Sequence, residues 1–213
     1  MVLKTGRSGK AQELAKSHTG SLSGADKVLR AVFKRYGVIE ARDLEELCGL
    51  AAAFSWLEEL PKGERCVFMN VSGGEAGVMA DLTDEFGIRL AEYHPETKAY
   101  LQTLVPDYGS VNNPFDMTAG IGYNTPVMVR AMEAISKDDH VDAICIAYTI
   151  TPEIWDDTIS HMVEAVSIAR ENPDMKPVFW IPFIEHTRHQ ASADILQKAG
   201  VPLLHQGATD AES

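Results

Sequence analysis

One histidine of the chain lies among small and hydroxylated residues, in the segment Lys16-Ser-His-Thr-Gly-Ser-Leu-Ser-Gly24. A neutral imidazole carries a lone pair on one ring nitrogen, so His18 could attack a phosphoryl group and hold it through an N–P bond. Small neighbours leave room for phosphate oxygens, and Ser17, Thr19 and Gly20 offer hydroxyl or backbone N–H groups to bind them. Taken by themselves, these residues favour the plainer interpretation, a solvated histidine in a polar loop.

A glycine pair in the segment Asn70-Val-Ser-Gly-Gly-Glu-Ala-Gly77 is the second candidate. It follows an apolar run that predicts a buried strand, and it precedes a helical pattern. Ser72, Gly73 and Gly74 would let the backbone approach a bound group, while a helix start offers N–H donors and a dipole that favours an anion. A tight turn without a ligand explains the same residues equally well. The spacing matches neither a dinucleotide-binding fingerprint nor a hydrolase nucleophile elbow.

Three further segments carry weaker patterns. Gly6-Arg-Ser-Gly-Lys10 is not a Walker loop, because its glycine spacing is too short and Ala11 replaces the residue that would hold magnesium. His186 and His189 could bind a metal on one helix, but no third ligand is placed, so a polar loop is favoured and no metal site is predicted. Residues 112–118 form either a functional loop or a proline-ordered turn in which Asp116 caps the next element. The remaining histidines are interpreted as surface or capping residues: His94, His140, His161 and His205.

The N-terminal third of the sequence predicts mostly helix after an initial loop. Residues 1–24 are predicted as a loop with a strand end and one short helical turn. Apolar spacing predicts a helix from residue 25 to Gly37 and another from Asp43 to about Leu60. Pro61-Lys-Gly63 then breaks the chain, so we expect a domain boundary there.

Beyond that break, short apolar runs alternate with helical segments, which implies right-handed crossovers and a parallel sheet covered on both faces. The predicted strands lie at residues 66–70, 88–91, 143–147, 177–181 and 202–204, and the predicted helices at 74–86, 95–104, 125–136, 153–171 and 189–199. We therefore predict an α/β fold: a flavodoxin-like, doubly wound parallel sheet over residues 63–213, preceded over residues 1–62 by part of a second such domain.

Charge and composition narrow the function classes. The 213 residues carry a net charge of −12, which argues against a nucleic-acid partner. The first 36 residues nevertheless hold 8 Lys and Arg against 2 Asp and Glu, so an anion is best sought there. No apolar run reaches the roughly 20 residues of a membrane span, and no secretory signal opens the chain, which predicts a cytoplasmic protein. The cysteines, interpreted as buried reduced thiols, are Cys48, Cys66 and Cys145.

Six segments occur in a characteristic order: Leu3-Lys-Thr-Gly-Arg-Ser8, Ser17-His-Thr-Gly-Ser-Leu-Ser-Gly24, Tyr36-Gly-Val-Ile39, Asp43-Leu-Glu-Glu-Leu47, Val71-Ser-Gly-Gly74 and Asn113-Pro-Phe-Asp-Met-Thr118. This order resembles that of NDP-forming acyl-CoA synthetases, relatives of succinyl-CoA synthetase and ADP-forming acetyl-CoA synthetase. The resemblance implies that His18 matches the histidine that this family phosphorylates transiently. It also implies that Ser72, Gly73 and Gly74 match one of two helix starts that hold the phosphohistidine loop.

The same resemblance implies a phosphoryl relay between acid, CoA, phosphate and a nucleotide, ATP and ADP or GTP and GDP, with Mg. This chain itself is predicted to bind no cofactor, because nothing in it matches the family's CoA-binding or ATP-grasp domains. We expect a fragment or a split-gene subunit, inactive alone, whose partners are those domains or subunits within a homo-oligomer or hetero-oligomer. The alternatives are a non-catalytic ligand-binding or regulatory module and a metal-dependent hydrolase that uses His186 and His189.

Overall fold

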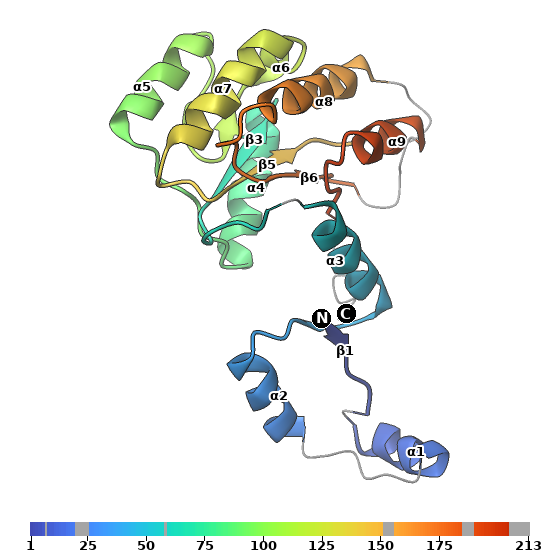
Figure 1. Cartoon of the computed structure of the whole chain (residues 1–213). Coiled ribbons are helices and arrows are strands. Elements are labelled where there is room, and N and C mark those ends of the chain that lie inside the picture. The colour runs from blue at the N-terminus through green and yellow to red at the C-terminus, as the bar shows by residue number, and fades with distance from the viewer. Residues whose placement is uncertain (7, 20–25, 58, 151–155, 185–189, 205–213) are drawn as a thin grey trace. The chain divides into compact units, whose positions relative to one another are not determined.

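The computed structural model describes residues 1–213 except 7, 20–25, 58, 151–155, 185–189 and 205–213 (Figure 1). The described residues fall into two compact units, which we name unit 1 (residues 1–52) and unit 2 (residues 53–204). The division between the units lies within one helix, α3 (Leu44–Trp56). The domain limits 1–62 and 63–213 remain predictions.

Unit 1 combines two short parallel strands with helices. Its elements are β1 (Val2–Leu3), α1 (Gly9–Thr19), α2 (Asp26–Arg35), β2 (Glu40–Ala41) and the first part of α3. Val2 pairs with Glu40 and Leu3 with Ala41. The strand end at residues 2–3 and both predicted helices are confirmed, whereas β2 was not predicted.

The prediction of a loop over residues 1–24 with one short helical turn is wrong over residues 9–19, because the turn is extended there into α1, a helix of 11 residues. The Ser8 hydroxyl accepts a hydrogen bond from the Ala11 N–H at 3.2 Å, as an N-cap does. The residues after this cap include several strong helix formers, Lys10-Ala-Gln-Glu-Leu-Ala-Lys16. The next helix, α2, is followed by Gly37 at a φ of +63°, and the Asp43 carboxylate caps α3 by accepting from the Glu46 N–H at 2.8 Å. This third helix ends at Trp56, earlier than predicted.

Unit 2 is built on a parallel sheet in the order β4-β3-β5-β6. The strands are β3 (Cys66–Asn70), β4 (Phe115–Asp116), β5 (Ala143–Ala147) and β6 (Val178–Ile181). The predicted strands at 88–91 and 202–204 shrink to single bridges, Leu90 with Cys66 and Leu203 with Trp180. With those bridges included, the order of the sheet is that of a flavodoxin-like fold.

Helices cover both faces of this sheet, as doubly wound folds require. They are α4 (Gly73–Glu85), α5 (Pro95–Leu104), α6 (Thr118–Gly122), α7 (Thr125–Lys137), α8 (Asp157–Ala169) and α9 (Gln190–Lys198). Residues of the strands alternate between two cores. Val67 and Met69 face a large core under α5 to α9, and Phe68 faces a smaller one with Met79 of α4. In Figure 1, α4 lies across the sheet from α7 and α8.

The Asn113 side chain makes hydrogen bonds to backbone groups at the edge of the sheet, where a neighbouring strand would otherwise make them. Its Nδ2 donates to the carbonyls of Cys66 at 2.7 Å and Ala91 at 3.0 Å, while its Oδ1 accepts from the Phe68 N–H at 3.0 Å. These bonds place β4 beside the end of β3, where Asn70 and Asp116 are register partners. The segment 112–118 is thus ordered by its asparagine, and it delivers Asp116 to the carboxyl end of the sheet.

All three cysteines are free thiols, but Cys48 is exposed on α3, which corrects the expectation that all are buried. In unit 2, Cys145 is buried and Cys66 is half-buried. Among the described residues, no helix has the length and apolar character needed to cross a membrane.

Candidate functional site

The segment that follows β3 opens α4 at the carboxyl edge of the sheet. Ser72 is the N-cap of this helix, with an extended backbone at φ −148° and ψ 135°, and its hydroxyl accepts from the Gly74 N–H at 3.2 Å. The neighbouring N–H groups of Gly73 and Glu75 have no acceptor within the helix, because the first turn of any α-helix lacks one. Ser72, Gly73 and Gly74 lie at the surface. The predicted turn is therefore a helix start whose donors are accessible to an anion.

A second segment approaches this helix start from β4. A Cβ added to Gly73 would lie 3.2 Å from Asp116 Oδ2, tighter than ordinary contact. The other carboxylate oxygen, Asp116 Oδ1, accepts from the Thr118 N–H at 2.9 Å. Glycine suits residue 73 because Asp116 occupies the space that a side chain would need.

Glu75 adds a second carboxyl group in the first turn of α4. Burial raises the pKa of Glu75, the charge of Asp116 acts in the same direction, and the backbone N–H of Val71 opposes both. The charged form of Glu75 is therefore disfavoured beside the helix start.

Three buried polar atoms around this edge have no hydrogen-bond partner among the described residues: Asn70 Oδ1, Glu75 Oε2 and Thr118 Oγ1. Buried polar atoms are almost always paired in folded proteins, with protein groups, ordered water or a ligand. They come from the last residue of β3, the first turn of α4 and the first residue of α6. Their gathering here indicates a place for polar groups from outside the chain.

The backbone is also strained at this edge. Thr118 has a φ of +66°, in the left-handed region that a β-branched residue rarely adopts. Such conformations cost free energy and gather at functional sites. The Asp116 carboxylate holds the Thr118 N–H, so the residue that crowds Gly73 also stabilises the strained turn.

The helix start after β5 differs from that of α4. Asp156 caps α8 by accepting from the Thr158 N–H at 2.9 Å, and its second oxygen accepts from the hydroxyl of Tyr148. Burial and the Asp156 contact raise the pKa of Tyr148, so its hydroxyl stays a donor. A charged cap already fills this helix start. Of these two helix starts, only that of α4 carries a neutral cap.

His18 lies in the last turn of α1, in unit 1, and not in the loop that its neighbours suggested. Ser17 beside it is exposed, and its hydroxyl donates to the Leu14 carbonyl at 2.7 Å. Thr19 is the last residue of the helix, while Gly20 lies outside the described residues. The backbone thus places His18 at a helix C-terminus, directly before the rest of its motif.

The other histidines fall into three groups. His186, His189 and His205 lie outside the described residues, so the structure does not test the alternative of a metal site at the first two. His94 and His140 are exposed, as expected. His161 lies inside α8 and not at an element edge, because the helix that contains it extends on both sides.

Sequence reasoning missed the convergence of Asp116, Glu75 and Thr118 on the glycine pair. Asp116 and Thr118 lie 42 to 45 residues away from the glycines in the sequence, and the pairing of β4 with β3 brings the two segments together. The sequence signal that could have indicated these residues was the polar end of their segment, Asp116-Met-Thr118, after a short apolar run.

Comparisons with known proteins agree on one family. The family model of the succinyl-CoA ligase like flavodoxin domain matches residues 1–54. The alpha subunit of an ADP-forming acetate–CoA ligase II from Pyrococcus furiosus is 33% identical over 206 residues, which cover 95% of this chain and 43% of that protein. A 4-hydroxybutyrate–CoA ligase (ADP-forming) from Nitrosopumilus maritimus is 34% identical over 124 residues, 58% of this chain and 18% of that protein.

A solved structure gives the same answer. It is acetyl-coenzyme A synthetase 1 of Candidatus Korarchaeum cryptofilum in complex with phosphate and ADP, which superposes with a TM-score of 0.73 at 26% identity. The match covers 95% of this chain and 42% of that one. The chain thus spans less than half the length of these relatives. Together, the profile match, the sequence identities and the shared fold show that the chain belongs to the family of NDP-forming acyl-CoA synthetases.

Proposed function

We propose that this chain carries the phosphoryl group of an NDP-forming acyl-CoA synthetase on His18 and that the start of α4 binds that group during the relay. The observation that carries the proposal is the accessible, neutrally capped N-terminus of α4, in a chain that also contains the matching histidine motif. The related acetyl-coenzyme A synthetase was solved with phosphate and ADP, which is the chemistry that such an anion site serves.

The relay consists of balanced transfers at His18. A nucleoside triphosphate gives its γ-phosphoryl group to a ring nitrogen, which forms an N–P bond while the bond to the diphosphate breaks. A carboxylate oxygen then attacks phosphorus, which releases the imidazole and yields an acyl phosphate. The thiol of CoA displaces phosphate from that intermediate, and every step runs in reverse for nucleotide synthesis. Nucleophilic catalysis divides one difficult transfer into easier ones.

The start of α4 would stabilise the negative charge of the phosphoryl group during its transfer. A phosphoryl group in transfer spreads negative charge over its oxygens, and preorganised N–H donors stabilise such charge. Ser72 holds the Gly74 N–H, so the first turn is fixed while the amides of Gly73 and Glu75 stay available to the ligand.

Nucleotide, Mg and CoA would come from other domains or subunits, since this chain spans only part of its relatives. The acetate–CoA ligases of Pyrococcus furiosus are named as alpha subunits, so a separate partner chain is the arrangement we propose. The full enzyme would activate a carboxylic acid.

The experiment combines this chain with the matching ATP-grasp and CoA-binding partners and ATP labelled at its γ-phosphate. We expect acid-labile, base-stable label on the wild-type chain and none on His18→Asn. His161→Asn is the matched control, and it keeps the label because His161 lies on α8. Label that survives in His18→Asn would overturn the carrier role, and no label on the wild-type chain would favour the non-catalytic regulatory module.

A second pair of variants tests the α4 site separately. Gly73→Ala places a Cβ 3.2 Å from Asp116 Oδ2, whereas Gly77→Ala on the same helix meets nothing within 4 Å. We expect phosphorylation of His18 to slow by at least about tenfold in Gly73→Ala and to stay unchanged in Gly77→Ala, because a displaced donor stabilises transferred charge poorly. Equal rates in the two variants would remove the α4 start from the mechanism.

A further inference from the structure

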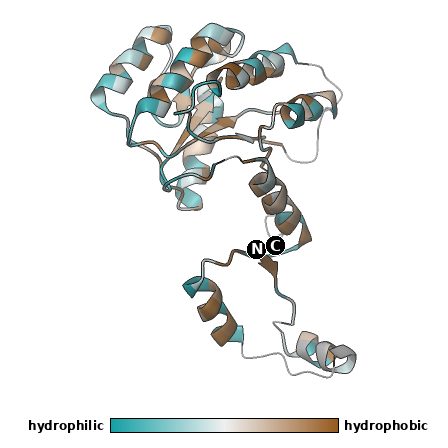
Figure 2. Cartoon of the chain, in the orientation of Figure 1, coloured by the Kyte–Doolittle hydropathy of each residue, from teal (hydrophilic) through white to brown (hydrophobic). Residues whose placement is uncertain are grey.

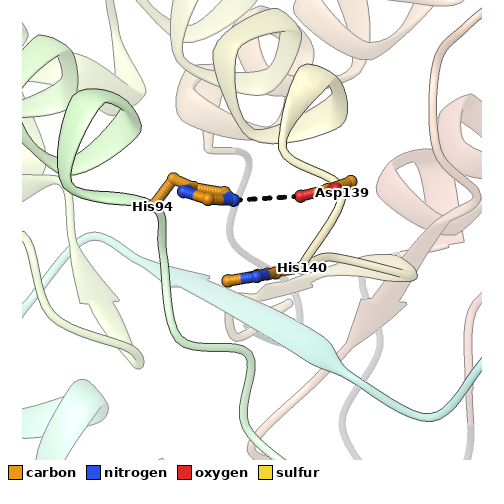
Figure 3. Close-up of side chains that lie close together, drawn as sticks. All are labelled: His94, Asp139 and His140. Atoms are coloured by element: carbon orange, nitrogen blue, oxygen red, sulfur yellow. Dashed lines mark hydrogen bonds and ion pairs between the residues drawn. The ribbon is translucent and has the colours of Figure 1, made fainter.

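Two histidines and an aspartate meet on unit 2 away from the site described above. The Nε2 atom of His94, at the start of α5, lies 3.1 Å from Asp139 Oδ1, in the segment between α7 and β5 (Figure 3). The rings of His94 and His140 are stacked, with centroids 4.1 Å apart. One ligand atom from each of the three residues lies within 4.8 Å of the others, and all three side chains are exposed.

One buried carboxylate holds the two histidines in place. Asp138 is 3% exposed, its Oδ2 accepts from the His94 N–H at 2.8 Å, and its Oδ1 accepts from the His140 N–H at 2.9 Å. The backbones that carry both rings are therefore fixed to the same side chain, although they lie 46 residues apart in the sequence.

Arg65 fixes the other side of the same segment. Its guanidinium donates to the Asp139 carbonyl at 2.7 Å and binds the Asp142 carboxylate through Nε at 2.9 Å and Nη2 at 3.0 Å. The backbone of residues 138–142 is thus held from both directions. The backbones that carry the three side chains are therefore fixed, whereas the exposed His94 ring must turn out of its stack on His140 before both in-plane lone pairs can meet at one ion.

A hydrogen bond to the backbone also sets the tautomer of the His140 ring. Its Nδ1 lies 3.1 Å from the Glu92 carbonyl oxygen, which can only accept, so Nδ1 carries the proton and Nε2 keeps its lone pair. An Nδ1–H bond to a carbonyl or carboxylate accompanies most histidines that bind metals. This bond is a second observation, independent of the clustering, that points to a metal.

We propose that His94, Asp139 and His140 form a binding site for a divalent transition metal, with Zn²⁺ the best fit. Two imidazoles and one carboxylate are borderline ligands that suit Zn²⁺, whereas Mg²⁺ prefers an all-oxygen set. Three protein ligands leave a fourth position for water. The metal would join the segment before α5 to the segment before β5 and so stabilise unit 2.

Its position separates this site from the proposed phosphoryl chemistry. Residues 138–140 precede the amino end of β5, whereas Ser72 follows the carboxyl end of the neighbouring strand β3. β3 is 5 residues long and so spans about 16 Å at roughly 3.3 Å per residue. Binding of the metal would therefore act on the stability of unit 2 and not on the transfer at His18.

The test titrates Zn²⁺ into the full, metal-stripped chain by calorimetry. We expect the wild-type chain to show a binding step that weakens at least about tenfold in His94→Ala, in His140→Ala and in Asp139→Asn, because even outer-shell changes cost metal affinity on that scale. His161→Ala is the matched control and keeps the step. Mg²⁺ alone, at the same concentrations, gives no such step.

Thermal unfolding gives a second readout that does not depend on the heat of binding. Zn²⁺ should raise the melting temperature of the wild-type chain and of His161→Ala, and leave that of the His94→Ala/His140→Ala double variant unchanged, because only the folded chain holds the site together. Each variant is first melted in chelator, which shows whether it folds like the wild type. Equal Zn²⁺ affinity and an equal shift in the double variant and the wild type would overturn the proposal.

Discussion

Units 1 and 2 differ in how far they bury their apolar residues. In unit 1, Gly6 and Ala41 are buried among the residues whose burial is described, and α2 contributes none. Apolar residues lie along α2 (Figure 2). The side chains of this stripe and of the residue after the helix are exposed instead, with Val28 at 65%, Val32 at 42% and Tyr36 at 71%. Unit 2 surrounds fully buried side chains such as Trp180 and Leu101 with helices on both faces of its sheet.

A helix can be stabilised by packing against its own chain or against another surface, and a sequence pattern does not distinguish the two. An amphipathic stripe predicts a helix whether or not its own chain supplies the surface that covers the stripe. Most helical stability in proteins comes from such packing. Unit 2 supplies the packing itself, and unit 1, which carries His18, is expected to obtain it from a partner chain, a second copy or another domain.

The largest expected effect compares the same substitution in both units. Leu101→Ala should lower the free energy of unfolding by about 2–5 kcal/mol, because Leu101 is fully buried in unit 2 and its loss leaves a cavity. Leu44→Ala should change it by no more than about 0.5 kcal/mol, since Leu44 in unit 1 is 69% exposed. Urea unfolding followed by circular dichroism measures both. Equal losses would mean that unit 1 is as well packed as unit 2.

The next largest expected effect on the free energy of unfolding comes from the ion pair between Arg65 and Asp142 in unit 2. The Arg65 guanidinium holds the pKa of Asp142 at about 2, below its usual value of 3.8. A depressed pKa in the folded state contributes stability above the unfolded pKa and loses it as pH falls through the folded pKa, here between about pH 4 and pH 2. Asp142→Asn should therefore cost about 2 kcal/mol at pH 7 and little at pH 2. A cost that did not depend on pH would assign the loss to packing.

Much of unit 2 was predictable, because strong local patterns decided it. The strand 66–70 and the helix 95–104 have the predicted bounds, since an apolar run between breaks and a proline at a helix start are local signals. The short elements β4 and α6 were missed. Asn113 substitutes for backbone partners there, and such a role depends on residues 22 to 47 positions away.

The candidate site shows the same limit. Ser72, Gly73 and Gly74 were predicted from a strand-to-helix transition, and the N-cap at Ser72 bears out the local part of that prediction. That Asp116 would crowd Gly73 could not be predicted, because it follows from strand pairing. The loop expected around His18 is a helix because Ser8 caps it and helix formers follow. The phosphoryl chemistry expected of both motifs stays a prediction.

A smaller effect on stability, of opposite sign, is expected for Glu75 at the start of α4 in unit 2. Burial raises the pKa of Glu75, so the folded state favours its protonated form, and that preference is lost as pH rises through the folded pKa. Glu75→Gln should thus stabilise the chain at pH 7 by up to about 1 kcal/mol and leave its stability near pH 4 unchanged. Unfolding curves at the two pH values measure the difference. Destabilisation at pH 7 would show that the hydrogen bond from the Val71 N–H outweighs the cost of burying the Glu75 carboxylate.

The smallest effect on stability tests the exposed stripe of α2. Val28→Ser with Val32→Ser should change the free energy of unfolding by no more than about 0.5 kcal/mol, because both side chains are already exposed. The same pair should weaken association of the chain with itself or with its partner subunits, since apolar side chains at such a surface contribute about 25 cal/mol for each Å² that they bury. Sedimentation velocity at micromolar concentration measures this association, and Val78→Ser, on the exposed side of α4 in unit 2, is the control. A wild-type chain that stays strictly monomeric, alone and with its partner subunits, would show that the stripe binds no partner and that unit 1 is ordered without one.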